Sequence, residues 1–286
     1  MTYVILVNGL LPYESGKTWT VLGLAKTLQY YRRFKVALYK PIAGHSAWYQ
    51  FKTILNSLKY NVLVGEDVVK YREVLGLNYS LELINPVDFL LAPLNPKRFT
   101  NIIEYISALD NQFNQIVMIR RSDYESCLTE YFIVRENIDR IVQELKYWIN
   151  KLAEKFNPES ISVKDIISIA YSEKTMKILD YCLKVLCESS DIVIVESFND
   201  AAVPYYNILE KINSVFTVTP GYIFKLNTNN FKKVVKKQYL VYGDVGLRMS
   251  NIISKVNIEH ITPLPPVETV NELSSYLKEY INKILT

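Results

Sequence analysis

The 286-residue sequence predicts an α/β protein of three layers, in which a mostly parallel central sheet is flanked by helices. Two observations predict this fold. Short, continuously apolar runs, typical of strands buried on both faces, alternate with longer segments of helical periodicity. No linker, repeat or low-complexity segment divides the chain. We therefore expect a single domain that spans residues 1–286.

The first strand is expected at residues 3–8, where the apolar run YVILVN ends at Gly9. A helix is expected at 18–30, because apolar residues recur there at helical spacing. Four further strands are expected at similar apolar runs, at residues 35–39, 191–195, 215–219 and 258–264. The stretch 267–285 carries its apolar residues on one face and predicts an amphipathic helix. Strands joined through helices have crossover connections, which predict parallel neighbours.

The middle of the chain, residues 98–157, interrupts this alternation. It predicts a hairpin with strands at 116–121 and 128–135, followed by one long charged helix at 136–156 that ends before Pro158. We interpret this segment as an insertion into the domain.

The composition excludes several classes of protein. With 33 Lys+Arg and 29 Asp+Glu, the net charge of +4 is mild and argues against a nucleic-acid partner. No apolar stretch approaches the roughly 20 residues of a spanning helix, so we expect no membrane partner. Three cysteines lack the spacing of a disulfide framework or a zinc site, and we expect them to be buried apolar residues of a cytoplasmic protein.

The sharpest motif is LPYESGKT, residues 11–18, which we call the phosphate loop. It follows the first strand and meets the pattern G-x-x-x-x-G-K-[ST], except that Leu11 replaces the first glycine. Backbone N–H groups around Ser15 and Gly16 would cradle phosphate oxygens, and Lys17 would bridge the terminal phosphates. The hydroxyl of Thr18 would ligate Mg²⁺. This Walker A placement predicts nucleotide binding and a P-loop NTPase fold; the alternative is a Gly-Lys-Thr that merely opens a helix.

Two charged residues follow other predicted strands. Lys40 comes after the second strand, and ligands of open parallel sheets bind at that end, so Lys40 would point to the same phosphates. The alternative is that Lys40 is an ordinary surface lysine that follows a strand. Glu196 directly follows the run at 191–195, where a metal ligand is useful. The alternative is a strand-end acid that pairs with a helix cap or a lysine.

Taken in order, these motifs resemble dethiobiotin synthetase and its relatives among the P-loop ATPases. Residues 82–96 (ELINPVDFLLAPLNP) and 191–204 (DIVIVESFNDAAVP) are also similar to segments of that family. The resemblance covers roughly residues 1–96 and 160–286. It implies a homodimeric, Mg-ATP-dependent ligase that phosphorylates a carboxylate or carbamate of a small-molecule acceptor.

The resemblance also implies roles for individual residues. Lys17 and Lys40 would neutralise the transferred phosphoryl group. Thr18, Asp67 and Glu196 would hold Mg²⁺ directly or through water, as hard oxygen ligands do. For Asp67 the alternative is that it caps a helix at 68–75.

Four residues are candidates for substrate contact. His45 follows the Lys40 loop and could act as a base, the alternative being a surface residue. Arg120 and Arg121 lie in the inserted hairpin and could bind an anionic substrate. Ser197 opens the segment Ser-Phe-Asn-Asp, which stands where the family has a glycine-rich loop.

Because Phe198 and Asn199 replace those glycines, we expect the chain not to make dethiobiotin itself at a useful rate. The alternative to a ligase is a nucleotide-dependent regulatory switch without ligase activity.

Overall fold

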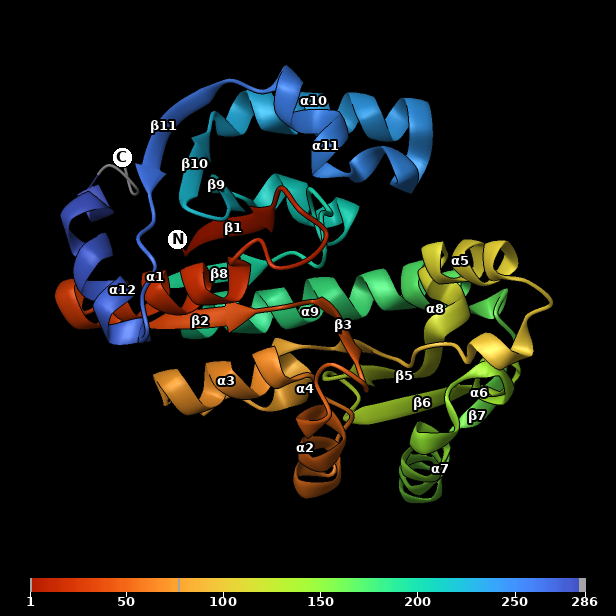
Figure 1. The fold of residues 1–286 in the computed structure, drawn as a ribbon. Coiled ribbons are helices and arrows are strands. Elements are labelled where there is room, and N and C mark those ends of the chain that lie inside the picture. Colours follow the sequence, from red (N-terminus) through yellow and green to blue (C-terminus); the bar gives the residue numbers. More distant parts are fainter. Residues whose placement is uncertain (1, 77, 283–286) are drawn as a thin grey trace. The chain divides into compact units, whose positions relative to one another are not determined.

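The structure is a computed structural model that describes residues 2–76 and 78–282 (Figure 1). The chain forms two compact units. The first unit comprises residues 1–41, 71–78 and 183–286, and the second comprises residues 42–70 and 79–182. The prediction of one domain with an insertion at 98–157 stays a prediction, and the second unit extends beyond that insertion on both sides.

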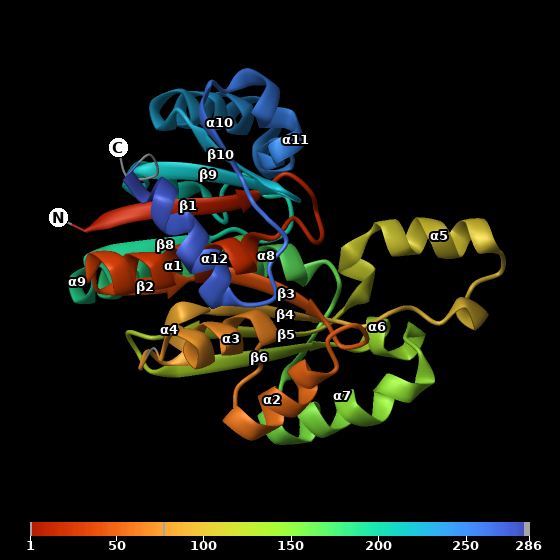
Figure 2. The same cartoon turned by 60° about the vertical axis from the view of Figure 1, so that its left-hand side comes forward.

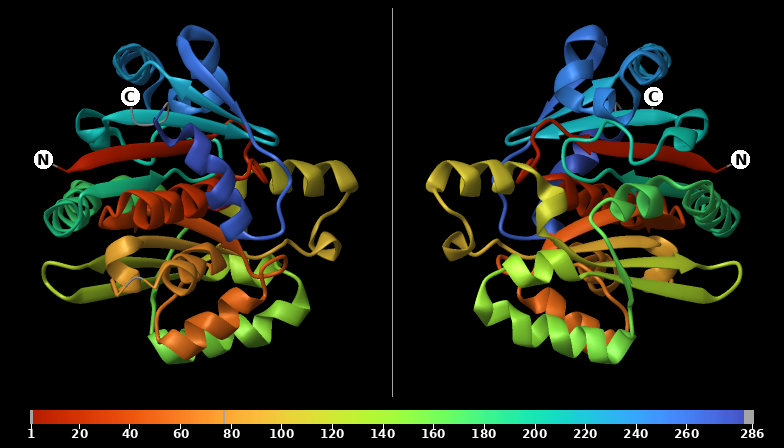
Figure 3. Two further views of the ribbon diagram at one scale, coloured as in Figure 1. Left: turned by 90° about the vertical axis from the view of Figure 1, so that its left-hand side faces the viewer. Right: turned by 90° about the vertical axis from the view of Figure 1, so that its right-hand side faces the viewer.

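The first unit is built on a six-stranded sheet in the order β11–β10–β9–β1–β8–β2 (Figure 1). Its strands are β1 (Tyr3–Gly9), β2 (Val36–Tyr39), β8 (Ile192–Glu196), β9 (Ser214–Thr219), β10 (Tyr222–Leu226) and β11 (Ile258–Pro263). The side chains of β2 and β8 are buried throughout, as their continuous apolar runs predict. The stacking of β10, β9, β1 and β8 is visible from both sides in Figure 3.

The sheet is mixed: the part formed by β9, β1, β8 and β2 agrees with the expected mostly parallel sheet, and β10 adds antiparallel pairs that were not expected. Neighbours among β9, β1, β8 and β2 are parallel, but β10 is antiparallel to both β9 and β11. Strand β10 was not expected, because Pro220-Gly221 follows the strand at 215–219 and this pair is typical of a strand's end. In the structure this pair is a tight turn with Gly221 at φ +82°, and Thr219 pairs with Tyr222 across it.

Helix α1 (Lys17–Arg32) packs on β1, β2, β8 and β9 and lies beside α12 (Val270–Leu277), as Figure 2 shows. The close approach depends on Gly23, where a Cβ would lie 2.8 Å from Leu273. The helix expected at 267–285 is shorter, and its residues 283–285 lie outside the described ones. The first unit also holds α10 (Thr228–Tyr242), α11 (Met249–Ile252) and the 3₁₀ helices at Tyr206–Lys211, Gly243–Leu247, Ile253–Lys255 and Lys278–Tyr280.

The second unit contains its own five-stranded sheet, in the order β3–β4–β5–β6–β7. The strands are β3 (Ile42–Ser46), β4 (Val87–Leu91), β5 (Ile116–Asp123), β6 (Leu128–Val134) and β7 (Glu159–Ile161). The hairpin of β5 and β6 confirms the one expected from the sequence. Two sheets, each in its own unit, replace the single central sheet that was expected.

A core of aliphatic side chains fills the second unit between its sheet and the helices α2 (Lys52–Tyr60) and α7 (Gln143–Phe156), which contact each other (Figure 3). The expected helix at 136–156 is broken into α6 (Arg135–Arg140) and α7. Ile141 is fully buried and forms a β-bridge with Leu94, so this contact interrupts the helix. The remaining helices of this unit are α4 (Leu81–Ile84), α5 (Ile102–Asp110), α8 (Asp165–Tyr171) and the 3₁₀ helices at Pro96–Arg98 and Gln112–Gln115.

Two helices contribute residues to both units, α3 (Glu66–Leu75) and α9 (Glu173–Ser189). On α9, Cys182 is buried and Cys187 half-buried, but Cys127 is exposed at the turn between β5 and β6, where its φ is +56°. The expectation of three buried cysteines is therefore wrong for Cys127. Among the described helices, none is both long and apolar enough to cross a membrane.

Candidate functional site

The phosphate loop connects the end of β1 to the start of α1. Gly16 stands at the N-cap of α1 with φ +86°, a left-handed conformation that favours glycine. Within the described residues, no side chain caps this helix end, and its first turn holds no acidic residue. The N–H groups and positive dipole end of α1 therefore favour an anion at this position.

Gly9, at the end of β1, makes room for the side chains of the phosphate loop. A Cβ on Gly9 would lie 2.3 Å from Ser15 Oγ and 2.7 Å from Lys17 Nζ. Leu11 occupies the first glycine position of the motif, yet it does not adopt a positive φ. Gly9 thus makes room for Ser15 and Lys17, and Leu11 does not need the left-handed conformation that favours glycine.

Lys17 bends back over the loop. Its Nζ donates to Ser15 Oγ at 3.0 Å and to the backbone carbonyl of Asn199 at 2.8 Å. Asn199 adopts φ +44°, so an asparagine takes the left-handed conformation that a glycine would otherwise provide. Because Asn199 takes this backbone conformation, the absence of glycines from the segment after β8 matters less than the sequence indicates.

Glu196 lies at the carboxyl end of β8, beside Val7 of β1. Because Tyr39 of β2 pairs with Val195, the next residue, Lys40, is brought to the same edge. Lys40 Nζ lies 2.8 Å from Glu196 Oε1, and both side chains are buried, with 8% and 1% exposed. Thr18 Oγ1 donates to the same Oε1 at 3.1 Å. The structure therefore brings Thr18, Lys40 and Glu196 into one cluster, the Glu196 cluster, in which Glu196 does pair with a lysine.

Tyr71, which was not predicted from the sequence, completes the Glu196 cluster. This tyrosine of α3 is fully buried, and its hydroxyl donates to Glu196 Oε2. A single tyrosine in an amphipathic helix has no sequence signal that marks it as part of a site.

Asn8 was also missed. Its amide donates to the carbonyl of Ala202 at 2.8 Å, and its Oδ1 accepts from Thr217 Oγ1 at 2.7 Å. Ser197 is buried, and its hydroxyl donates to the carbonyl of Ala201 at 2.7 Å. These bonds order the segment after β8 whose Asn199 carbonyl contacts Lys17; contact of Ser197 with a substrate stays a prediction.

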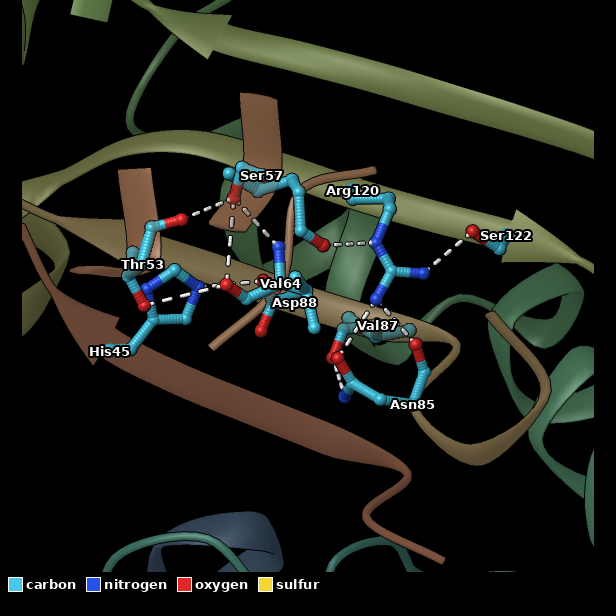
Figure 4. A network of polar contacts seen from close by, with 10 residues as sticks. His45, Thr53, Ser57, Val64, Asn85, Val87, Asp88, Arg120 and Ser122 are labelled. Atoms are coloured by element: carbon cyan, nitrogen blue, oxygen red, sulfur yellow. Dashed lines mark hydrogen bonds and ion pairs between the residues drawn. The ribbon is translucent and has the colours of Figure 1, made fainter. Parts of the chain in front are cut away.

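The other candidates belong to the second unit. Asp67 lies in the first turn of α3 together with Glu66, a position that also suits a favourable interaction with the helix dipole. His45 lies on β3 and is buried, which contradicts the alternative of a surface residue, and its Nε2 is 2.7 Å from Asp88 Oδ2 (Figure 4). Gly65 makes room for the imidazole, since a Cβ there would lie 3.0 Å from it.

Both arginines of the hairpin are engaged within the second unit. Arg120 is fully buried and donates to the carbonyls of Leu63 and Asn85, to the Asn85 side chain and to Ser122 Oγ, at 2.5–2.8 Å (Figure 4). Arg121 Nε lies 2.9 Å from Glu130 Oε2. These contacts connect β5 to β6, to Leu63 after α2 and to Asn85 at the end of α4. Binding of a substrate by either arginine stays a prediction.

The donor set of the Glu196 cluster fits one kind of metal. Over residues 2–76 and 78–282, no group of three or more His, Cys, Asp or Glu side chains is placed to hold a metal ion. One carboxylate and one hydroxyl, next to a loop suited to phosphate, fit Mg²⁺, which keeps several waters and shares its coordination with phosphates. They do not fit an ion that requires a cage of protein ligands.

Comparison with known proteins adds little to this geometry. No protein-family profile matches the chain, and no curated protein does. Among solved structures, the chain is similar to a KaiC-like protein from the hyperthermophilic archaeon Pyrococcus horikoshii, with 14% identity over 78% of each chain and a TM-score of 0.24.

Proposed function

We propose that this chain binds a nucleoside triphosphate, ATP, together with Mg²⁺ at the phosphate loop. The observation that carries the proposal is the Glu196 cluster. Three parallel strands end at one edge of the sheet, and there a hydroxyl, a lysine and a carboxylate meet beside an uncapped helix N-terminus. Ligands of open α/β sheets bind at this edge.

Each residue of the site has a distinct part in binding. The N–H groups of α1 would receive phosphate oxygens, and Lys17 and Lys40 would neutralise them. Thr18 Oγ1 and Glu196 Oε1 would hold Mg²⁺; a role of Asp67 as a ligand is what the resemblance implies and stays a prediction. Bound Mg²⁺ supplies neutralisation of the negative charge on the phosphates.

For the reaction, we propose transfer of the γ-phosphoryl group to a carboxylate or carbamate oxygen of a small acceptor. That oxygen bonds to the γ-phosphorus while the bond from phosphorus to the β,γ-bridging oxygen breaks, so that ADP leaves and a mixed anhydride forms. The protein would act by positioning and charge neutralisation. This step, and a homodimeric assembly, are supported by the resemblance to dethiobiotin synthetase, with dethiobiotin itself not the expected product.

A second candidate function is a nucleotide-dependent switch, and the contact between Lys17 and Asn199 favours it. A phosphate that recruits Lys17 Nζ would release the Asn199 carbonyl and free the segment after β8 to move. A ligase should release phosphate only with its acceptor present, whereas a switch should hydrolyse slowly without one.

The proposal is tested with Lys17→Ala. We expect the affinity for Mg-ATP to fall about 10- to 100-fold, because a charge-assisted bond to phosphate is worth about 1.5–3 kcal/mol. Binding of a fluorescent ATP analogue measures the affinity, and circular dichroism measures the melting temperature, which should change little. Lys26→Ala, on the same helix, is the matched control. Unchanged affinity in the Lys17 variant would contradict the proposed site.

A further inference from the structure

The two oxygens of Glu196 have different surroundings. Oε1 accepts from Lys40 Nζ at 2.8 Å and from Thr18 Oγ1 at 3.1 Å, on the side of the phosphate loop. Oε2 accepts from the hydroxyl of Tyr71, which comes from α3. The carboxylate is thus held at both oxygens, by residues from two chain segments of the first unit, 1–41 and 71–78.

We infer that Tyr71 is a positioning residue that sets the orientation of Glu196 for Mg²⁺, an inference that rests on the proposed function. The terminal torsion of a glutamate is broad, so the contacts at Oε1 alone leave the carboxylate plane poorly fixed. The Tyr71 hydroxyl fixes Oε2 and thereby directs Oε1 toward Thr18. Partners of a ligating group that do not touch the metal typically change metal affinity 10- to 100-fold.

The burial of Tyr71 makes the hydroxyl effective in this role. A buried hydroxyl keeps its hydrogen bond, because leaving the group without a partner in an apolar environment is unfavourable. The ring is fully buried and so has little freedom to move away from Glu196. By contrast, Lys40 carries a charge that phosphate groups compete for when nucleotide binds. Tyr71 is a neutral donor, as Thr18 is, and it donates to Oε2. Its bond to Glu196 is compatible with both the nucleotide-free and the nucleotide-bound protein.

The experiment compares Tyr71→Phe with the wild type in a Mg²⁺ titration of ATP-analogue binding. We expect the half-saturating Mg²⁺ concentration to rise about 10-fold, with the affinity measured in EDTA unchanged within about twofold. Tyr3→Phe is the matched control, because Tyr3 lies at the other end of β1 and its hydroxyl contacts Ser214 Oγ at 2.9 Å. Its Mg²⁺ dependence should equal that of the wild type.

An unchanged Mg²⁺ dependence in folded Tyr71→Phe would overturn the inference while leaving nucleotide binding intact. Tyr71→Met, which fills similar space without a hydroxyl, provides the same measurement if the phenylalanine variant misfolds. Failure of both variants to fold would assign Tyr71 to the core and also overturn the inference. If the wild type binds no nucleotide, the proposed function itself fails, and the Lys17→Ala experiment shows this separately.

Discussion

At the scale of single residues, the burial of the pair formed by Glu196 and Lys40 couples ligand binding to folding. Removing one partner of a buried ion pair leaves the other charge uncompensated, which typically costs about 3–5 kcal/mol. Substitution of Glu196 or Lys40 alone therefore changes folding and ligand binding together. Lys17 and Gly9 offer cleaner tests, because neither belongs to this pair.

Gly9→Ala should weaken Mg-ATP binding with little effect on stability. The new Cβ would approach two side chains of the phosphate loop, at Ser15 Oγ and at Nζ and Cδ of Lys17, and both side chains can rotate away. The displaced Lys17 would then approach phosphate less well, and we expect an affinity loss of about 10-fold. Isothermal titration calorimetry measures it, with urea unfolding as the stability control. A large loss of stability with normal affinity would show that Gly9 serves the fold alone.

Much of the phosphate-binding edge could be predicted from the sequence, because Gly16, Lys17 and Thr18 form a local motif. Lys40 and Glu196 each follow an apolar run, and parallel strands end at the same edge, so their proximity could also be expected. Tyr71 could not be predicted. Its contact with Glu196 joins positions 125 residues apart through the packing of a helix, which leaves no trace in local spacing.

At the scale of elements, apolar runs predicted strands well where the strand is buried on both faces. Strand β10 is half-exposed and follows a two-residue turn, so its pattern resembles the end of β9 more than a new strand. The break between α6 and α7 was also missed. A tertiary contact of Ile141 with Leu94 outweighs the helical periodicity there, and periodicity alone contains no information about such a contact.

The hairpin of β5 and β6 should show a pH-dependent contribution to stability. Burial raises the pKa of the Glu130 carboxyl, but hydrogen bonds from Arg121 and Lys174 outweigh it, so the pKa lies below its ordinary value of 4.5. The contribution is therefore present above about pH 4.5 and is lost as the pH falls through the lowered pKa. Since Glu130 is partly exposed, we expect its contribution to the free energy of unfolding to be under about 1 kcal/mol.

Urea unfolding of wild type and Glu130→Gln at pH 7 and at pH 3 measures this contribution. The variant should be less stable than the wild type at pH 7, and the difference should shrink at pH 3. Glu125→Gln, in the exposed turn of the same hairpin, is the control. An equal difference in stability between wild type and variant at both pH values would mean that the ionisation of Glu130 does not contribute to stability.

At the scale of the whole molecule, the sequence predicted the α/β class but not the number of sheets. Strands β3 and β4 are short, and an apolar run does not reveal which sheet a strand will join. The Glu196 cluster was nevertheless foreseeable in part, because the strands that carry it all belong to the six-stranded sheet. Of the candidates in the second unit, Arg120 and Arg121 are held within that unit by their own hydrogen bonds.

Binding of Mg-ATP should therefore stabilise the protein through the first unit. A ligand that binds only the folded state at about 100 times its Kd adds about 2.7 kcal/mol of stability. For a cooperative unit of about 150–250 residues, each kcal/mol raises Tm by about 2–4 °C, so we expect a rise of about 5–10 °C. Differential scanning calorimetry measures this rise in Tm with Mg-ATP, with ATP in EDTA and with Mg²⁺ alone. The rise should be largest with Mg-ATP, small with Mg²⁺ alone and lost in Lys17→Ala. An equal rise in that variant would place the nucleotide at a different site.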